Sequence, residues 1–204
     1  MFTGIVQEIG TIHTIESLGD GLQITVASSF AETCHIDESI AINGVCHTVT
    51  AFNNETFTVQ SVAETLRKTS MRDLKEGQGV NLERSLTLQT GIEGHLVQGH
   101  VDTTGTITSI QQEGSDWLVT ISYEEAYKNL IVGRGSITVD GISLTVAREE
   151  NLEFTVAIIP YTYEHTNLKL KQAGDKVNLE FDMIGKYVVR YLASLGGKAG
   201  DLLG

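Results

Sequence analysis

Two short strings of this sequence place side chains with nucleophilic or hydrogen-bonding chemistry at matching positions. Cys46 stands in Asn43-Gly44-Val45-Cys46-His47-Thr48-Val49, and Ser143 stands at the same place in Asp140-Gly141-Ile142-Ser143-Leu144-Thr145-Val146. A thiol can act as a nucleophile, and the threonine hydroxyl two residues later can bind a polar ligand. An isolated cysteine on a strand is more often a small buried hydrophobic residue, so the two strings together matter more than Cys46 alone.

Further titratable side chains could move protons. Imidazole titrates near neutral pH, which makes His100 the natural proton shuttle. Asp140 and Asp182 could act as acids, bases or orienting groups. Asp140 precedes a glycine, which is also typical of an ordinary hairpin turn, so a purely structural role stays open for it. We interpret His95, in the same segment as His100, as a residue that orients this segment.

The elements that must position these side chains occur twice in the chain. At an offset of 97 residues, Val80-Asn81-Leu82-Glu83 aligns with Val177-Asn178-Leu179-Glu180; near the start the offset is 95, and Gly4-x-Val6 aligns with Gly99-x-Val101. A repeat this long is a duplicated domain and not a solenoid unit. Two copies of one pocket can bind two copies of one ligand, and positions where the copies differ are the first candidates for function.

The two copies differ at several chemically active positions. The differing pairs, first copy before second, are Cys46 and Ser143, Ile5 and His100, Asp37 and Arg134, and Ser85 (or its neighbour Arg84) and Asp182. From this alignment we expect the titratable excess to sit partly in each copy. A donor site and an acceptor site would require such an asymmetry.

Composition limits the classes of protein that fit. The chain has 204 residues and a formal net charge of −12, which argues against a nucleic-acid-binding surface. Its two cysteines, Cys34 and Cys46, form no CxxC motif, so neither a disulfide scaffold nor a zinc site is expected. The N-terminus lacks the pattern of a signal peptide, and no apolar run is long enough to span a membrane. We therefore expect a soluble cytoplasmic protein.

Short alternating β-branched segments predict an all-β fold. Examples are 23–26, 56–59, 118–121 and 154–156, separated by turn residues, a pattern typical of sandwiches or small closed barrels. Short helical stretches are expected at 63–71, 29–34 and 123–130. We place the boundary between the copies within 87–94 and predict two barrel domains, 1–93 and 94–183.

The last segment has no counterpart in the first copy. Apolar residues recur at helical spacing from Met183 to Leu195, and Gly196-Gly197 follows, so we predict an amphipathic helix with a tail, 184–204. Its apolar stripe could pack on its own domain. Pairing with the same helix of other subunits is at least as well supported, because closed symmetric oligomers are common.

The strings in order resemble the α-chain type of riboflavin synthase, in the lumazine-binding family. They are Met1–Val6, Asn43–Thr50, Gly94–Val101, Val139–Val146 and the repeated Val-Asn-Leu-Glu. The resemblance covers the whole chain. It implies two six-stranded Greek-key barrels, a C-terminal helix and a homotrimer built around these helices. It also implies dismutation of two 6,7-dimethyl-8-ribityllumazine molecules to riboflavin and 5-amino-6-ribitylamino-2,4(1H,3H)-pyrimidinedione, without a metal or organic cofactor.

The resemblance also implies a set of ligand contacts. Two lumazines would face each other between the first barrel of one subunit and the second barrel of its neighbour. In the first half the expected substrate-binding residues are Phe2, Thr3, Gly4, Ile5, Val6, Cys46, His47, Thr48, Gln60, Ser61, Val62, Ala63, Glu64 and Thr65. In the second half they are Gly99, His100, Val101, Arg134, Ser143, Leu144, Thr145, Ile159, Pro160, Tyr161, Thr162, Tyr163 and Glu164.

The reaction would need a nucleophile and groups that move protons. By resemblance Cys46 and Ser39 are assigned to supply or position the nucleophile, His100 to shuttle protons, and Asp140 and Asp182 to acid–base or orienting roles. Water or a substrate hydroxyl could instead be the nucleophile, with Cys46 only shaping the slot. The chain departs from the family at His47, where leucine is more common. Alternation puts that side chain on the face opposite Cys46 and Thr48, so we expect an effect on packing or the surface.

Other functions fit less well. Non-catalytic relatives bind lumazine or flavin as a fluorophore, but one copy of their pocket has degenerated, whereas both copies here keep their binding strings. A flavin-binding reductase module would be joined to a nucleotide-binding domain, and no GxGxxG motif follows a strand here. Neither the donor barrel nor any association with lumazine synthase follows from the sequence.

Overall fold

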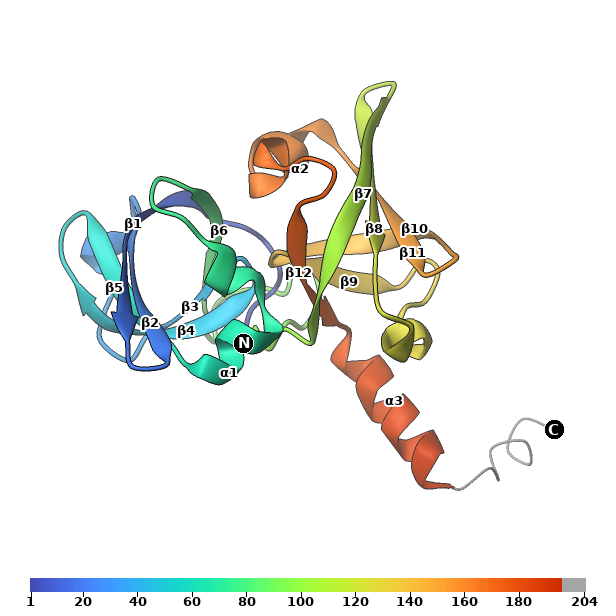
Figure 1. Cartoon of the computed structure of the whole chain (residues 1–204), viewed down its shortest axis with the longest axis horizontal. Helices are drawn as coiled ribbons and strands as arrows, with labels where there is room; N and C mark the ends of the chain where they lie inside the picture. Colours follow the sequence, from blue (N-terminus) through green and yellow to red (C-terminus); the bar gives the residue numbers. More distant parts are fainter. Residues whose placement is uncertain (196–204) are drawn as a thin grey trace.

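The computed structural model describes residues 1–195 as two closed six-stranded antiparallel barrels side by side, with a helix that projects away from them (Figure 1). Barrel 1 has the strand order β1-β2-β5-β4-β3-β6. Its strands are β1 (Glu8–Leu18), β2 (Gly21–Ala27), β3 (Ser39–Ile42), β4 (Val45–Phe52), β5 (Thr56–Ser61) and β6 (Gly79–Arg84).

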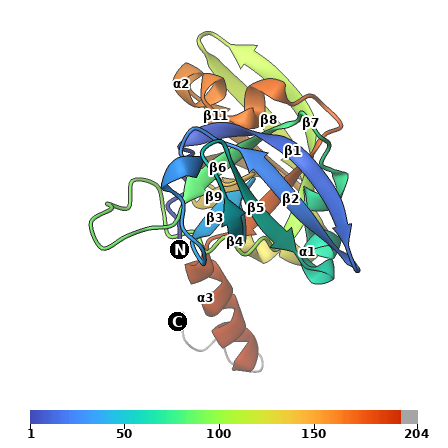
Figure 2. The same cartoon turned by 90° about the vertical axis from the view of Figure 1, so that its left-hand side faces the viewer.

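Barrel 2 repeats the same neighbour pattern in the order β10-β11-β8-β7-β12-β9. Its strands are β7 (Thr103–Glu113), β8 (Asp116–Ser122), β9 (Ser136–Val139), β10 (Ile142–Glu150), β11 (Glu153–Ile158) and β12 (Lys176–Phe181). The prediction of two closed barrels is confirmed. The boundaries proposed from the repeat, 93/94 and 183/184, fall in the long connection between β6 and β7 (Figure 2) and at the start of the last helix.

Alternating strand residues fill each barrel. Phe57 and Val59 of β5 are fully buried in the core of barrel 1, and Phe154 and Val156 of β11 are their counterparts in barrel 2. The period of two puts these side chains on one face of the pleat. Because each sheet closes on itself, each strand has a neighbour on both sides along at least part of its length.

Short helices close one side of each barrel. α1 (Ala63–Lys68) is followed by a 3₁₀ turn at Ser70–Asp73, and α2 (Pro160–Glu164) by a 3₁₀ turn at Asn167–Leu170. The helical stretch predicted over 63–71 is therefore present but interrupted at Thr69. Thr69 has extended backbone, its hydroxyl donates to the Thr65 carbonyl, and the same oxygen accepts from Met71 N, so the chain turns there. The other two predicted stretches contain 3₁₀ turns at Ala31–Thr33 and Glu125–Leu130.

The barrels meet through two hairpin turns that face each other. Gly44 and Gly141 both have positive φ, and a Cβ on either would lie 2.6–2.7 Å from the other's backbone nitrogen. Only glycine allows this approach. Around the turns lies a buried amide network with matching bonds on both sides: Asn81 Nδ2 donates to the Asp140 carbonyl (2.9 Å) and Asn178 Nδ2 donates to the Asn43 carbonyl (2.8 Å).

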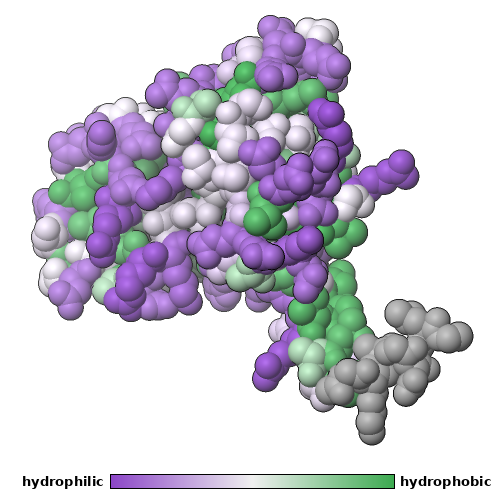
Figure 3. Space-filling view, turned by 45° about the vertical axis from the view of Figure 1, so that its right-hand side comes forward, coloured by the Kyte–Doolittle hydropathy of each residue, from purple (hydrophilic) through white to green (hydrophobic). Residues whose placement is uncertain are grey.

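The last helix, α3 (Met183–Ser194), begins at barrel 2 and projects away from both barrels (Figure 1). The Asp182 carboxylate accepts from Ile184 N at its start, and Lys186 pairs with Asp102 of barrel 2 at 2.6 Å. None of its residues is buried. Apolar side chains cover the helix in Figure 3, and Tyr187 and Tyr191 are 69% and 62% exposed.

The predicted terminal helix thus forms, but its apolar stripe is not covered by its own domain. The Gly196-Gly197 stop signal lies outside the described residues. Within residues 1–195, no helix has both the length and the apolar character needed to cross a bilayer.

Candidate functional site

Two buried glutamates hold two loop segments in place. The Glu83 carboxylate, at the end of β6, accepts from Thr3 N (2.6 Å), the Thr3 hydroxyl (2.8 Å) and Gly4 N (3.0 Å). Its counterpart Glu180, on β12, accepts from Gln98 N (2.7 Å) and Gly99 N (2.9 Å). Burial raises the pKa of both carboxyls, and these hydrogen bonds oppose it. Each glutamate therefore fixes a segment beside its own barrel.

Each held segment then crosses onto the other barrel. The Gly4 carbonyl accepts from Ser143 N of barrel 2 (2.7 Å), and the Gly99 carbonyl accepts from Cys46 N of barrel 1 (2.9 Å). Val6 packs against the core of barrel 2, and Val101 packs against the core of barrel 1.

Each crossing segment requires glycine where it lies closest to the opposite barrel. Gly4 and Gly99 both have positive φ, and a Cβ on either would lie 2.6 Å from the Cβ of Ser143 or Cys46. The repeated glycines recognised in the sequence are therefore explained by close packing between the segment and the opposite barrel.

Two equivalent pockets form where a crossing segment meets a short helix. The barrel-1 pocket, about 300 Å³, lies between Cys46, α1 and the crossing segment; its lining residues are Val45, Cys46, Glu64, Thr65, Lys68, Thr69, Gly99, His100 and Val101. The barrel-2 pocket, about 440 Å³, is lined by Ile5, Val6, Gln7, Glu8, Ile9, Tyr161, Thr162, Glu164, His165, Thr166 and Lys169. Ile5, Tyr161, Thr162, His165 and Thr166 are the repeat counterparts of His100, Glu64, Thr65, Lys68 and Thr69.

Both pockets contain titratable side chains, and the crossing decides which pocket each of them lines. His100 belongs to the second half of the sequence, but the crossing puts it in the barrel-1 pocket together with Cys46. The barrel-2 pocket receives Ile5 in the matching position, and Ser143 lies beneath Gly4 beside it. The thiol and the imidazole therefore share one pocket.

Comparisons with known proteins agree with this duplicated architecture. The family model described as "Lumazine binding domain" matches residues 3–85 and 98–182. Riboflavin synthase of Bacillus subtilis (strain 168) is 42% identical over 193 residues, which cover 94% of this chain and 90% of that protein. Riboflavin synthase of Mycobacterium tuberculosis (strain H37Rv) is 42% identical over 203 residues, covering 96% and 100%. The chain belongs to the riboflavin synthase family.

Solved structures with low sequence identity to this chain have the same fold. LumP in complex with riboflavin superposes with a TM-score of 0.83 at 22% identity, over 89% of this chain and 100% of that one. LumP in complex with 6,7-dimethyl-8-(1'-D-ribityl)lumazine gives a TM-score of 0.81 at the same identity. These structures establish the paired-barrel architecture for this riboflavin synthase family member.

The environment of Cys46 does not favour a free thiolate. Burial raises the pKa of the thiol; a hydrogen bond with Ser39 and the N-terminal amine lower it, and Glu180 raises it further. A thiol whose pKa lies above its ordinary range is mostly protonated at neutral pH. A protonated thiol is a weak nucleophile, which favours the alternative in which Cys46 shapes the slot.

The polar wall of the barrel-1 pocket comes from α1. Glu64 pairs with Arg67 and with Lys68 (3.0 Å) on the exposed side of the helix. The hydrogen bond from Arg67 is the main cause of a lowered pKa at Glu64. Thr65 faces the same pocket. A ligand chain bearing hydroxyl groups would find both acceptors and donors there.

His47 behaves as expected for the face opposite Cys46. Its side chain is buried between those of Val45 and Val49, which belong to the barrel-1 core. Nδ1 lies 2.8 Å from the Val45 carbonyl and Nε2 lies 2.6 Å from the Ser61 hydroxyl. Burial lowers the pKa of His47 to about 4. Ser61, predicted as a ligand contact, therefore points its hydroxyl into the barrel instead.

Several other predicted residues lie away from both pockets. Phe2 is fully buried in a small cluster with Ala41 and Val97, and Thr3 is held by Glu83. Both support the crossing segment and do not line a pocket. Arg134 is exposed in a turn with positive φ. The remaining residues of the predicted set outside the pocket walls are exposed or half-buried positions on strands, loops and the short helices: Thr48, Gln60, Val62, Ala63, Leu144, Thr145, Ile159, Pro160 and Tyr163.

The two predicted aspartates have structural partners. Asp140 is fully buried, accepts from Asn178 N (2.8 Å) and Asn167 Nδ2 (2.8 Å), and pairs with Lys171 at 3.1 Å. This burial between the barrels leaves no face toward a ligand, so the structural alternative for Asp140 is the one the geometry supports. Asp182 caps α3 and is half-buried, beside barrel 2.

His95 has more contacts than its sequence position indicated. Its Nδ1 lies 2.7 Å from the Ser143 hydroxyl and its Nε2 lies 3.2 Å from the Thr138 hydroxyl. Burial lowers the pKa of His95, and the negative charge of Asp182 opposes this. Because the first copy begins too late to contain a counterpart of His95, the repeat comparison could not reveal this contact.

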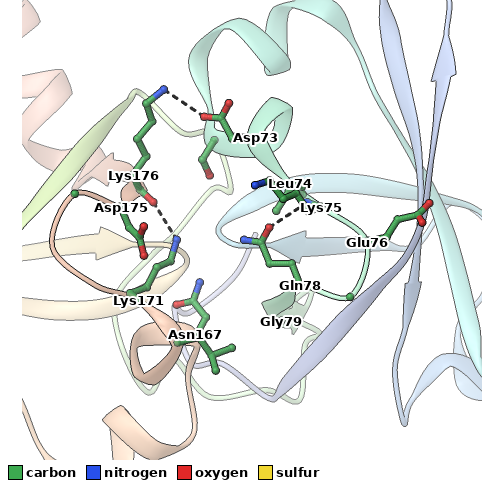
Figure 4. Close-up of a pocket in the computed structure, with 14 residues that line it drawn as sticks. Asp73, Leu74, Lys75, Glu76, Gln78, Gly79, Asn167, Lys171, Asp175 and Lys176 are labelled. Atoms are coloured by element: carbon green, nitrogen blue, oxygen red, sulfur yellow. Dashed lines mark hydrogen bonds and ion pairs between the residues drawn. The ribbon is translucent and has the colours of Figure 1, made fainter.

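A further cavity, larger than these two pockets at about 670 Å³, lies elsewhere (Figure 4). It is a groove between the two barrels, lined by residues from 70–79 and 167–176. Two of its lysines form ion pairs, Lys176 with Asp73 and Lys171 with Asp140 of the network beneath. No predicted site residue lines it. Among the described residues, no group of three or more His, Cys, Asp or Glu side chains is placed to bind a metal ion.

Proposed function

We propose that this protein is a riboflavin synthase, which converts two molecules of 6,7-dimethyl-8-ribityllumazine into riboflavin and 5-amino-6-ribitylamino-2,4(1H,3H)-pyrimidinedione. One lumazine donates a four-carbon unit to the other, and the two products together contain all the atoms of two substrates. The observation that carries this function is the pair of equivalent pockets in one chain. Two identical substrates require two sites of the same design.

The two ligands must also touch. The barrel-1 and barrel-2 pockets of one chain share no lining residue. Two lumazines bound in these separate pockets would therefore not lie face to face. We propose that the barrel-1 pocket of one subunit faces the barrel-2 pocket of the next in a homotrimer. Fixing both reactants in this way contributes on the order of 7–11 kcal/mol when the geometry is good.

The exposed apolar stripe of α3 supports an oligomer. Ile184, Tyr187 and Tyr191 leave their side chains mostly open to solvent, and the Lys186–Asp102 pair fixes the helix relative to barrel 2. Three such helices packed together would bury the stripe. The variant Tyr187→Lys/Tyr191→Lys should yield monomers in sedimentation and lose riboflavin formation. Arg190→Lys on the same helix should do neither.

The residues divide into three proposed roles. His100 exchanges protons with the bound lumazine, and Cys46 with Ser39 shapes the surface on which C7 is attacked. Attack by water or a substrate hydroxyl fits the raised thiol pKa better than attack by Cys46. Glu64, Thr65 and Thr162 offer hydrogen bonds to the ribityl chains. A cytoplasmic location and an association with lumazine synthase stay predictions.

The direct test mixes purified protein with 6,7-dimethyl-8-ribityllumazine alone and follows both products by absorbance and chromatography. Riboflavin and the pyrimidinedione in equal amounts would support the synthase. Tight lumazine binding without riboflavin would instead indicate a fluorophore-binding protein. Treatment with a chelator should leave the rate unchanged.

A further inference from the structure

The inner wall of barrel 1 contains a polar pair that barrel 2 lacks. His47 on β4 and Ser61 at the end of β5 meet inside the barrel, Nε2 to hydroxyl at 2.6 Å. At the repeat-related positions barrel 2 has Leu144 and Ile158, both packed in or against its apolar core. Barrel 1 thus has two polar residues that hydrogen-bond to each other where barrel 2 has two apolar residues. Both His47 ring nitrogens have partners, since Nδ1 donates to the Val45 carbonyl and Nε2 accepts from Ser61.

The pair lies where the backbone no longer joins these strands. The β4–β5 ladder runs from the Phe52–Phe57 pair to the Val49–Val59 pair. Beyond it the strands separate: His47 pairs with Ile40 of β3, and Ser61 pairs with Leu22 of β2. The bond between His47 and Ser61 spans this gap.

Both residues adjoin walls of the barrel-1 pocket. His47 directly follows Cys46, which lines the pocket. Ser61 precedes Val62, the N-cap of α1, and α1 supplies Glu64 and Thr65 to the same pocket. The side of the pocket formed by Cys46 and the side formed by α1 therefore lie on opposite sides of the gap that the His47–Ser61 hydrogen bond spans. A change in the width of this gap would change the distance between the two sides.

We propose that His47 and Ser61 are positioning residues whose hydrogen bond fixes the spacing between the Cys46 wall and the α1 wall of the barrel-1 pocket. This inference rests on the proposed function for its ligand, 6,7-dimethyl-8-ribityllumazine. It makes barrel 1 the more rigidly defined of the two lumazine sites, because Leu144 and Ile158 hold their gap by non-directional contact alone. A buried hydrogen bond is costly to leave half-made, so each partner depends on the other.

The test compares Ser61→Ala, which leaves His47 Nε2 unpaired, with the double variant His47→Leu/Ser61→Ile, which copies barrel 2. The control is Phe57→Leu, a core change in the same barrel that does not touch the bridge. Each protein is titrated with 6,7-dimethyl-8-ribityllumazine, and amide hydrogen exchange is followed at 45–48 and 63–65. Ser61→Ala should weaken one of two lumazine sites per chain roughly tenfold and speed exchange in both segments by a similar factor.

The double variant should bind at that site better than Ser61→Ala, and Phe57→Leu should lose stability without selective loss at one site. Equal weakening of both sites, or exchange in the two segments no faster than in Phe57→Leu, would overturn the positioning role. If the unaltered protein binds no lumazine, the proposed function fails. The exchange comparison then still decides the role of the bridge.

Discussion

The two pockets of this chain share one backbone design and differ in chemistry. Each is formed by a short helix and a crossing segment held by a buried glutamate; Cys46 lines the first pocket, and Ser143 lies beside the second. In the barrel-1 pocket that design carries a thiol, an imidazole and the Glu64–Lys68 pair. The barrel-2 pocket has Ile5 and Tyr161 at the positions of His100 and Glu64, and its own titratable groups come mainly from the α2 side: Glu164, His165 and Lys169.

The comparison separates two contributions. The duplicated backbone gives both pockets the same framework for binding, and the residues that differ between the copies give each pocket its own chemistry. The crossing segments decide which pocket a changed residue lines. His100 comes from the second half of the sequence but lines the pocket of the first barrel, so this pocket combines changed residues from both halves. We infer that the proton transfers carried out by His100 occur at the barrel-1 pocket.

The strongest test of this difference between the pockets is to replace His100. His100→Gln keeps a hydrogen-bonding side chain but cannot exchange protons near neutral pH, so kcat should fall by about a thousandfold. Ile5→Gln, at the matching position, should change KM more than kcat. Steady-state kinetics of both variants, with circular dichroism to verify folding, provide the check. A comparable fall in kcat for both would refute a special role for the barrel-1 pocket.

The buried imidazole of barrel 1 predicts a pH dependence that barrel 2 does not share. The pKa of His47 is lowered by burial from 6.5 to about 4; the Val45 carbonyl opposes this shift, and no charged side chain of the described residues contributes to it. Between these values the unfolded chain binds a proton that the folded chain does not. Stability is therefore full above pH 6.5 and falls as the pH is lowered toward 4.

Denaturant unfolding of the unaltered protein and of His47→Leu/Ser61→Ile measures this contribution. Over that range the unaltered protein should lose about 3 kcal/mol more of its free energy of unfolding than the double variant. Parallel pH profiles would show that His47 is not buried in the neutral form. The buried carboxyls of Glu83 and Glu180 are present in both proteins and cancel in the difference.

The crossing itself can be tested through the two glutamates. Glu180→Gln, on barrel 2, turns an acceptor into a donor opposite the amides of Gln98 and Gly99, and should cost about 2 kcal/mol. It should loosen the segment over the barrel-1 pocket, whereas Glu83→Gln should loosen the segment over barrel 2. Hydrogen exchange at 98–101 and 3–6 distinguishes the two. Loosening confined to the barrel that carries the substitution would argue against the crossing.

The smallest expected effect concerns the thiol. Cys46→Ser gives barrel 1 the residue of barrel 2, keeps the polar contact with Ser39 and should lower turnover about tenfold, with a smaller loss of lumazine affinity. Ser143→Cys is the reciprocal control and should leave turnover nearly unchanged. Equal losses of turnover and affinity in Cys46→Ser would make Cys46 a pocket-shaping residue only.

Much of the architecture could be predicted from local pattern. Period-two alternation identified the strands, the offset repeat identified two copies, and the apolar spacing after Met183 identified the terminal helix. The same alternation placed His47 opposite Cys46, as observed. These predictions succeed because strand and helix periodicities depend on neighbouring residues along one chain.

Predictions that depended on which surfaces meet were less successful. Ser61, Phe2 and Asp140 were expected at a ligand, and the structure buries each against protein partners instead. Composition and spacing do not distinguish a polar group that faces a ligand from one that pairs inside the protein, because both need the same donors and acceptors.

The sequence by itself determined two copies of one barrel, their strands, the glycine positions and the chemical types available at each copy. Only the tertiary structure decided which pocket receives which side chain. That decision depends on buried carboxylates that capture backbone amides some 80 residues away and on glycines that let the captured segment lie against the opposite barrel. Such contacts leave no periodic trace in the sequence, because each joins positions that become neighbours only when both barrels have closed.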